Sequence, residues 1–288
     1  MYRRRRPIVT AVLRVVALTL TTASLAHAQQ RPLVTEDPEV IGQGRILLEG
    51  GVTYGRDIFF PASGLRGNLL TVPEIGLSFG LGSIVELQFD GAVANRLAIT
   101  DRELAPLSPL LSVVGDRVSS VGDVTLATKI RLLGETAGRP AIGFRIATKL
   151  PNAPNEKGLG LDTIDFYSSL LVGKTVQSIR IVGNIGVGIL SDPTNATRQN
   201  DVLTLGASVA RAVTDAFEVV GEVNSRIDTR AGEPPPGTES RGWLRFGARF
   251  TRATTRIDIA LITGMTVRDP SWGFTAGATY VFDAFRIP

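Results

Sequence analysis

Apolar and polar residues alternate along most of the chain beyond residue 45. Between 179 and 189, Ile179, Ile181, Ile185, Val187 and Ile189 occupy odd positions, whereas the even positions are mostly polar or small. Side chains of a strand point to opposite faces with a period of two, so the pattern predicts strands with one apolar face. Such segments run near 45–55, 69–79, 83–93, 121–133, 140–150, 162–173, 178–190, 202–211, 216–227, 240–250, 255–265 and 271–282.

The length of these segments separates two kinds of β-protein. Most of them contain about ten to thirteen residues, whereas a strand of a soluble sandwich typically has ~5–6. A tilted strand that crosses a bilayer needs ~9–11 residues. The segments therefore favour a membrane barrel over a soluble sandwich.

The connections between the segments alternate in length. Short ones lie at 80–82, 134–139, 174–177, 212–215 and 251–254; the others, at 56–68, 94–120, 151–161, 191–201 and 228–239, are longer, with a short exception at 266–270. Outer-membrane barrels have short periplasmic turns and longer external loops. We therefore predict an all-β fold, an antiparallel transmembrane β-barrel of about 12 strands over 45–288, preceded by a periplasmic segment at 29–44.

The first 28 residues are typical of a secretory signal peptide. Four arginines from Arg3 to Arg6 precede an apolar stretch, and Ala26-His27-Ala28 matches the small-x-small pattern for cleavage after Ala28. The residues after the arginines, Pro7-Ile8-Val9, differ from the usual twin-arginine motif, which favours ordinary secretion over folded export. We expect a multi-pass protein of the Gram-negative outer membrane, with outer-membrane lipid and the barrel-assembly machinery as partners.

Removal of this signal changes the charge and the available chemistry. The whole chain has a net charge of +4, but five of its 31 basic residues precede residue 28, which leaves 26 basic against 27 acidic residues. A nearly neutral chain does not favour nucleic-acid binding. The only His, His27, is removed too, and there is no Cys. Ser-His-Asp and Cys-His sites, the usual zinc sites and His-ligated haem are thereby excluded, so we expect no enzyme activity, metal or cofactor.

The face opposite the apolar one contains charged residues of both signs. We expect twelve of them to line the lumen: Glu86, Asp90, Lys129, Arg131, Arg145, Lys149, Asp165, Arg180, Glu222, Arg245, Arg249 and Asp258. Their signs alternate between neighbouring strands, so they can pair across the sheet. Two interpretations stay open: the pairs brace a polar interior, or some of them line a permeation path.

The longest connection, 94–120, contains an unusually apolar sequence. Residues 104–111 read Leu-Ala-Pro-Leu-Ser-Pro-Leu-Leu. Long structured loops are often functional, so this segment is a candidate lid or a short helix at the rim. Apolar residues this close to a bilayer can equally rest on lipid.

Several short motifs resemble one known family. Residues 31–38, Arg-Pro-Leu-Val-Thr-Glu-Asp-Pro, and the segment 44–54 resemble the opening of the outer-membrane proteins named for the phenol-degradation meta-pathway. Gly122-Asp123-Val124, residues 128–133, Lys149-Leu150-Pro151, residues 157–160 and residues 163–166 resemble later parts of that family. The resemblance implies a transporter related in fold to hydrocarbon channels, and it supplies no catalytic residues.

Two classes of function follow. The first is an outer-membrane channel or transporter that passes small solutes, hydrophobic or aromatic ones included, through a narrow charge-balanced lumen. The second is a non-transporting structural or adhesion barrel that acts through its external loops. The sequence names neither the solute nor the oligomeric state.

Overall fold

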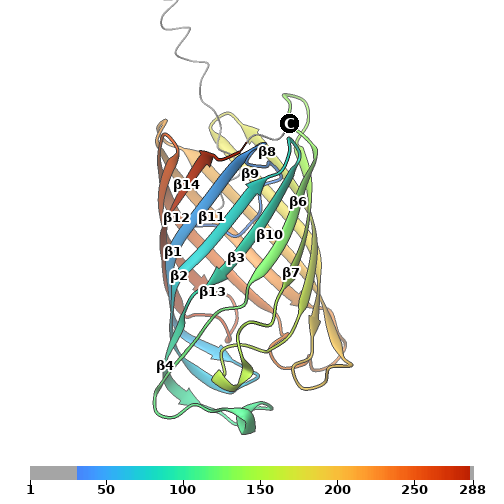
Figure 1. Ribbon diagram of the computed structural model, residues 1–288, viewed down its shortest axis with the longest axis vertical. Coiled ribbons are helices and arrows are strands. Elements are labelled where there is room, and N and C mark those ends of the chain that lie inside the picture. Colours follow the sequence, from blue (N-terminus) through green and yellow to red (C-terminus); the bar gives the residue numbers. More distant parts are fainter. Residues whose placement is uncertain (1–30, 286–288) are drawn as a thin grey trace, which may run out of the picture.

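The alternating segments form a closed antiparallel barrel in the computed structural model, which describes residues 31–285 (Figure 1). Twelve strands build its wall: β1 (Arg45–Phe60), β2 (Leu65–Gly80), β3 (Val85–Ala92), β6 (Thr125–Leu133), β7 (Ala141–Lys149), β8 (Asp165–Val176), β9 (Ile179–Ser191), β10 (Gln199–Ala212), β11 (Phe217–Asp228), β12 (Arg241–Arg252), β13 (Thr255–Gly264) and β14 (Trp272–Asp283). The barrel closes because β1 pairs with both β14 and β2. The predicted fold class and strand number are thus confirmed. The predicted signal peptide and its cleavage at Ala28 lie outside the described residues.

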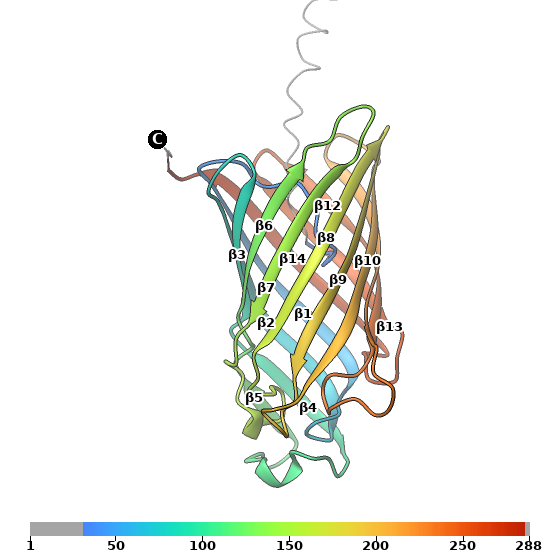
Figure 2. The same cartoon turned by 90° about the vertical axis from the view of Figure 1, so that its right-hand side faces the viewer.

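The two ends of the barrel differ, as Figures 1 and 2 show. At the turn end, short connections join β2 to β3, β8 to β9 and β12 to β13, and the wall begins and ends there because Arg45 pairs with Asp283. The longer connections gather at the other end, which we call the loop end. No helix within residues 31–285 is long and apolar enough to cross a membrane.

Apolar residues cover the outside of the wall between two groups of aromatic side chains. Leu48, Ile75, Phe246, Ile259 and Leu261 are all exposed. At the turn end Tyr280 stacks on Phe282, with ring centroids 5.4 Å apart; at the loop end Tyr54 packs against Trp272 and Phe274, at 5.6 and 5.8 Å. In water such a surface would aggregate, whereas an apolar band bounded by aromatic residues matches the lipid-facing surface of an outer-membrane barrel.

The loop end differs from the sequence prediction in two connections. Residues 56–68 are predicted to be an external loop, but β1 and β2 continue through most of this range and leave only 61–64 as the turn. Residues 94–120 contain two further strands, β4 (Asn95–Arg102) and β5 (Arg117–Ser120), and the short 3₁₀ helix η1 (Ser108–Leu110). Strand β4 pairs with the first half of β2, and β5 pairs with β4. The sheet therefore extends beyond the barrel, because β2 exchanges one neighbour, β3, for another, β4, along its length.

This extension has a small hydrophobic core of its own. Leu65, Leu97 and Ile99 are buried together, and Phe60, Leu69, Leu111, Val113, Val118 and Leu159 pack around them. The neighbouring connection between β7 and β8, which contains the 3₁₀ helix η2 (Asn155–Lys157), is held by hydrogen bonds from Ser63 Oγ to the Gly158 carbonyl and from Ser112 N to the Glu156 carbonyl. The apolar residues of 94–120 thus serve in part to build a folded layer at the loop end.

Candidate functional site in the barrel lumen

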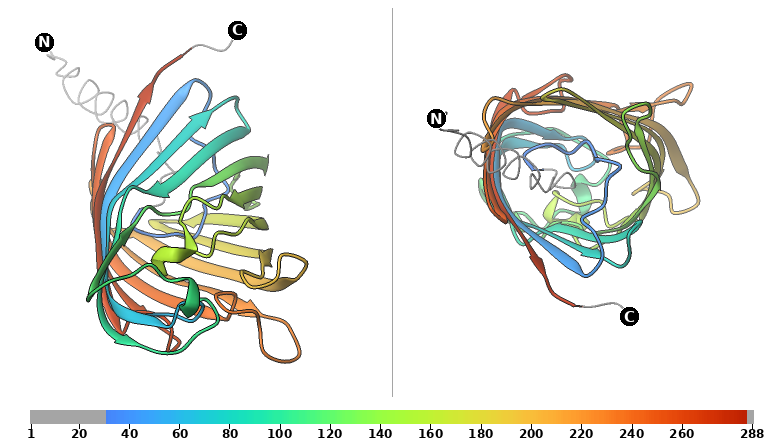
Figure 3. Two further views of the ribbon diagram at one scale, coloured as in Figure 1. Left: turned by 60° about the horizontal axis from the view of Figure 1, so that its bottom comes forward. Right: turned by 90° about the horizontal axis from the view of Figure 1, so that it is seen from above.

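The chain that precedes β1 lies inside the barrel. Residues 31–41, which we call the inner belt, follow the inner surface of the wall, as the end-on view in Figure 3 shows. Prolines at 32 and 38 keep this segment from pairing as a strand, since proline has no N–H to donate. Residues 29–44 are predicted from the sequence to lie in the periplasm; the structure instead places 31–41 in the lumen.

Wall side chains satisfy the backbone of the inner belt. A segment without a strand partner still needs acceptors for its N–H groups. Glu222 accepts hydrogen bonds from Val34 N and Thr35 N at 2.8 and 2.7 Å, and Glu86 accepts one from Ile41 N at 2.8 Å. Asn184 binds both backbone groups of one belt residue: it accepts a hydrogen bond from Glu36 N at 2.7 Å and donates one to the Glu36 carbonyl at 2.8 Å.

Acidic side chains of the inner belt pair with basic residues of the wall. Glu36 lies 3.0 Å from Arg145 and 3.4 Å from Lys129, whose side chain is completely buried. Asp37 binds the Arg180 guanidinium through two hydrogen bonds of 2.6 and 2.8 Å. A bidentate arginine–carboxylate pair is among the stronger polar contacts in proteins, so these pairs fix the belt to β6, β7 and β9.

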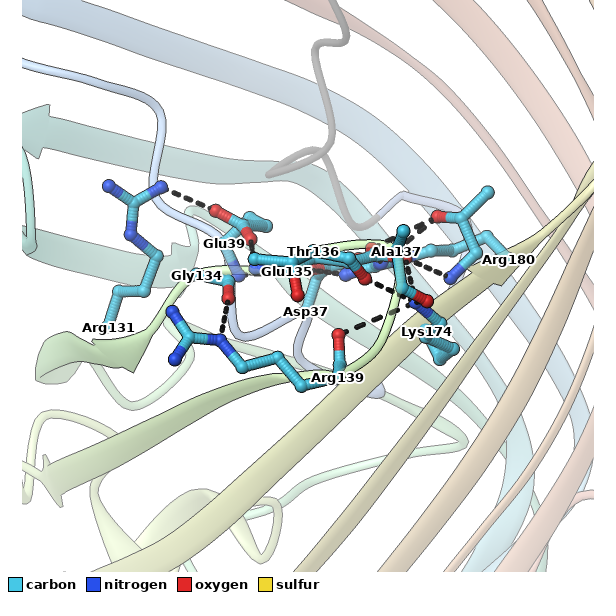
Figure 4. A network of polar contacts seen from close by, with 11 residues as sticks. Asp37, Glu39, Arg131, Gly134, Glu135, Thr136, Ala137, Arg139, Lys174 and Arg180 are labelled. Carbon is cyan, nitrogen blue, oxygen red and sulfur yellow. Dashed lines mark hydrogen bonds and ion pairs between the residues drawn. The ribbon is translucent and has the colours of Figure 1, made fainter.

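The turn-end part of the belt is joined to a connecting turn, drawn in Figure 4. Glu39 pairs with Arg131 at 2.6 Å, and Glu135, in the turn after β6, contacts Arg180 and Lys174. Burial opposes ionisation of Glu135, but the hydrogen bond from Thr175 N and the Arg180 guanidinium outweigh it and lower the pKa of this carboxyl. Glu135 is therefore held as an anion between two cations.

The belt also has apolar and steric contacts. Leu33 is buried with Ala210 and Val220, and Ile41 with Leu47 and Val281. Pro38 lies against glycines of the wall: a Cβ added to Gly143 would approach it to 3.1 Å, and one added to Gly173 to 2.9 Å. Side chains at these two positions would collide with the belt, so glycine in the wall leaves the space that Pro38 occupies.

A chamber remains between the belt and β1, β2, β3 and β6. Its volume is about 480 Å³, and its charged lining residues are Glu36, Glu49, Glu74, Asp90, Asp123, Arg31 and Arg145. Five carboxylates thus face two guanidiniums. Arg31 is 3.1 Å from Glu74 and 3.6 Å from Asp258, and Arg145 is 3.8 Å from Asp90. Carboxylates thus outnumber guanidiniums in the lining, while Glu36 and Asp123 also pair with Lys129 and Lys149 of the wall.

The twelve residues expected to line the lumen are held in ion pairs within it. These pairs are Glu86–Lys129 (3.3 Å), Glu36–Lys129 (3.4 Å), Asp90–Arg145 (3.8 Å), Arg131–Glu39 (2.6 Å), Lys149–Asp123 (3.0 Å), Lys149–Asp165 (3.4 Å), Arg180–Asp37 (2.6 Å), Glu222–Arg245 (2.8 Å), Arg249–Glu218 (4.0 Å) and Asp258–Arg31 (3.6 Å). Their role in permeation stays a prediction.

Two kinds of pairing occur, and the sequence pattern predicts one of them. Glu86–Lys129 and Glu222–Arg245 join neighbouring strands, as alternation of sign predicts. Arg131 and Arg180 instead bind the acidic residues of the inner belt. The belt residues Arg31, Glu36, Asp37 and Glu39 are absent from the predicted set, although three carboxylates within four positions beside a proline are a visible signal of a segment that needs basic partners.

Comparisons with known proteins place the fold. No protein-family model matches the sequence, and no curated protein matches it either. The COG4313 outer-membrane channel from Pseudomonas putida F1 is similar in structure, with a TM-score of 0.63 and 13% identity over 85% of this chain and 98% of that chain.

Two further solved structures resemble the chain more distantly. The NanC porin has a TM-score of 0.49 with 8% identity, and it covers 84% of this chain and 100% of its own. The TodX deltaS2S3 mutant, a monoaromatic hydrocarbon channel, has a TM-score of 0.42 with 12% identity, covering 86% and 93%. Together with the twelve-stranded wall, the likeness to the P. putida structure identifies the fold as that of an outer-membrane β-barrel.

Proposed function

We propose that this protein is an outer-membrane channel for small solutes, in which the inner belt sets the width of the passage. The observation that carries the proposal is the belt itself, which is bound to the wall by backbone and side-chain contacts from Arg31 to Ile41 and lies beside an acidic chamber of about 480 Å³. A barrel that served only as an anchor would not need a polar chamber. A twelve-stranded barrel is also narrower than the 16–18-stranded porins, so a belt inside it restricts passage to small molecules.

The chamber also points to a class of solute. The family resemblance of the sequence favours hydrophobic or aromatic molecules, and the surplus of carboxylates favours cations and neutral molecules over anions. We therefore propose small neutral or cationic solutes, aromatic ones included, as the molecules that pass.

Planar-bilayer recordings test the proposal. A variant without residues 31–41 is expected to conduct more than the full barrel because the constriction is gone. Asp37→Asn with Glu39→Gln, which loosens the belt without removing it, is expected to shift conductance in the same direction and provides the test if the deletion impairs folding.

A cross-link fixes the belt in place as the matched control. A Cβ added at Gly206 would lie 3.6 Å from the Cβ of Thr35, within the ~3.5–4.5 Å of natural disulfides, and the chain has no other cysteine. Oxidised Thr35→Cys/Gly206→Cys protein should conduct as it does after reduction. An oxidised protein that conducts only after reduction would show that the belt must move for solutes to pass. Absence of conductance in both the full barrel and the deletion would contradict a channel and favour the adhesion barrel.

A further inference from the structure

The outer surface of the loop-end extension contains a second concave site, outside the lumen. A groove of about 610 Å³ lies over β1, β2 and the β4–β5 pair, and it is lined by Tyr54, Asn68, Leu70, Arg96, Leu97, Ala98, Arg117, Val118 and Ser119. Arg96 and Arg117 are the charged members of this lining, and no carboxylate is among them. The groove is therefore apolar with two positive charges.

The strand register brings the two arginines together on the outer face. Leu97 and Ile99 are buried in the loop-end core, so the alternate residues Arg96 and Ala98 point outward. Arg117 is directly opposite Ala98, and Ser119 is opposite Arg96. Arg96 and Arg117 are thus diagonal neighbours on one face, for which Cα atoms are typically ~7–8 Å apart.

Both guanidiniums lack partners among the residues that the structure describes. Within residues 31–285, no ion pair or side-chain hydrogen bond involves Arg96 or Arg117, and both residues are exposed. Arg66, on the same extension, behaves differently, because it lies 3.7 Å from Asp57 and 3.8 Å from Glu103. Two unpaired arginines side by side, next to a paired one, indicate a site for an anion supplied from outside the protein.

The position of the groove relative to the membrane interface indicates which anion it can bind. Leu70 pairs with Tyr54 on one side and with Arg96 on the other, and Tyr54 pairs with Phe274. Arg96 therefore lies in the same row of the sheet as these two aromatic residues. Aromatic groups of this kind mark the level of lipid headgroups. Arg117, opposite Ala98, lies two residue positions farther toward the loop end, where phosphates of an outer-leaflet lipid would be found.

We propose that this groove binds the phosphorylated headgroup of lipopolysaccharide, with Arg96 and Arg117 on one lipid A phosphate. Guanidinium groups match phosphate oxygens in geometry and charge, while Leu70 and Ala98 form an apolar floor for the adjoining glycolipid. The inference rests on the outer-membrane location of the proposed channel and on the loop end facing the outer leaflet, as the alternation of connection lengths predicts, and not on transport. Its failure would leave the proposed channel unaffected.

Titration of the purified full barrel, followed by native mass spectrometry, tests the site. Arg96→Gln/Arg117→Gln is expected to weaken binding of bisphosphorylated lipid A by about tenfold or more. A tenfold change in Kd corresponds to ~1.4 kcal/mol, which is no more than a single charge-assisted hydrogen bond typically contributes. The matched control is Arg211→Gln/Arg252→Gln, which removes two exposed arginines at the turn end and should leave lipid A binding unchanged.

Three results would overturn the proposal. They are unchanged lipid A affinity in Arg96→Gln/Arg117→Gln, an equal loss in the turn-end control, and equal binding of dephosphorylated lipid A or phosphatidylglycerol by the unaltered barrel. Partial recovery in Arg96→Lys/Arg117→Lys would support it, since lysine keeps the charge but not the planar fork. Heat-modifiable gel mobility confirms that each variant is folded before it is titrated.

Discussion

Two regions of the lumen use the same residue types for different purposes. Toward the turn end, carboxylates and cations meet across the belt and the wall, as in Arg180–Asp37 at 2.6 Å and Lys129–Glu86 at 3.3 Å, with Lys129 wholly buried. At the chamber, by contrast, Glu49, Glu74 and Asp90 face open space, and Glu74 and Asp90 each have one arginine partner, at 3.1 and 3.8 Å. A charge matched by a second chain segment braces the barrel, whereas a charge that faces a cavity acts on whatever enters it.

The largest expected effect comes from breaking the buried ion pairs of Lys129, which join the inner belt and the wall. Lys129→Met would remove the cation that Glu36 and Glu86 share, leaving Glu86 without it and Glu36 with Arg145. Removal of one partner of a buried pair costs about 3–5 kcal/mol. Urea unfolding of the barrel in detergent micelles should show a loss of this size. Neutralising the partner as well, in Lys129→Met/Glu86→Gln, should restore part of it.

Lys174 provides the matched comparison, since it also pairs with a glutamate but is partly exposed. Lys174→Met should cost less than about 1 kcal/mol, because solvent already screens the pair. Equal losses in Lys129→Met and Lys174→Met would mean that the belt does not brace the wall.

A second change targets the chamber beside the inner belt. Glu74→Gln with Asp90→Asn leaves three carboxylates against two guanidiniums in place of five against two, so most of the preference for cations should disappear. Uptake of benzyltrimethylammonium relative to benzenesulfonate into proteoliposomes measures this preference. The control is Glu218→Gln. Glu218 does not line the chamber, and it lies 3.6 Å from Arg256. A preference that changes equally in both variants would contradict a selective chamber.

The smallest expected effect is a pH dependence at the turn end. The pKa of Glu135 is lowered in the folded protein, so its stabilising effect is complete above the ordinary pKa of a glutamate and is lost as pH falls through the lowered value. Glu135→Gln should therefore be less stable than the unaltered barrel at neutral pH, and the two should converge in acid. Stability curves that stay parallel down to acidic pH would show that Glu135 is not held as an anion between Arg180 and Lys174.

The sequence predicted the strands of the wall better than the inner belt that lies within them. Alternation at 179–189 and 255–265 located β9 and β13 within one or two residues, because a strand with one face in lipid must repeat every second position. The inner belt has no such period. Its hydrogen bonds join Val34 to Glu222 and Asp37 to Arg180, residues more than a hundred positions apart, and no local pattern encodes which distant residue a short irregular segment meets.

Local sequence pattern is sufficient for the twelve-stranded wall, its two faces and the alternation of short and long connections, since each follows from periodicity and from the chemistry of turns. Long-range contacts were needed to show that residues 31–41 enter the lumen and that β2 exchanges β3 for β4 to extend the sheet. The position of the belt depends on closure of the barrel, which brings Glu86, Asn184 and Glu222 from separate strands around one space. Only then do they supply hydrogen-bond acceptors for a segment that has no strand partner.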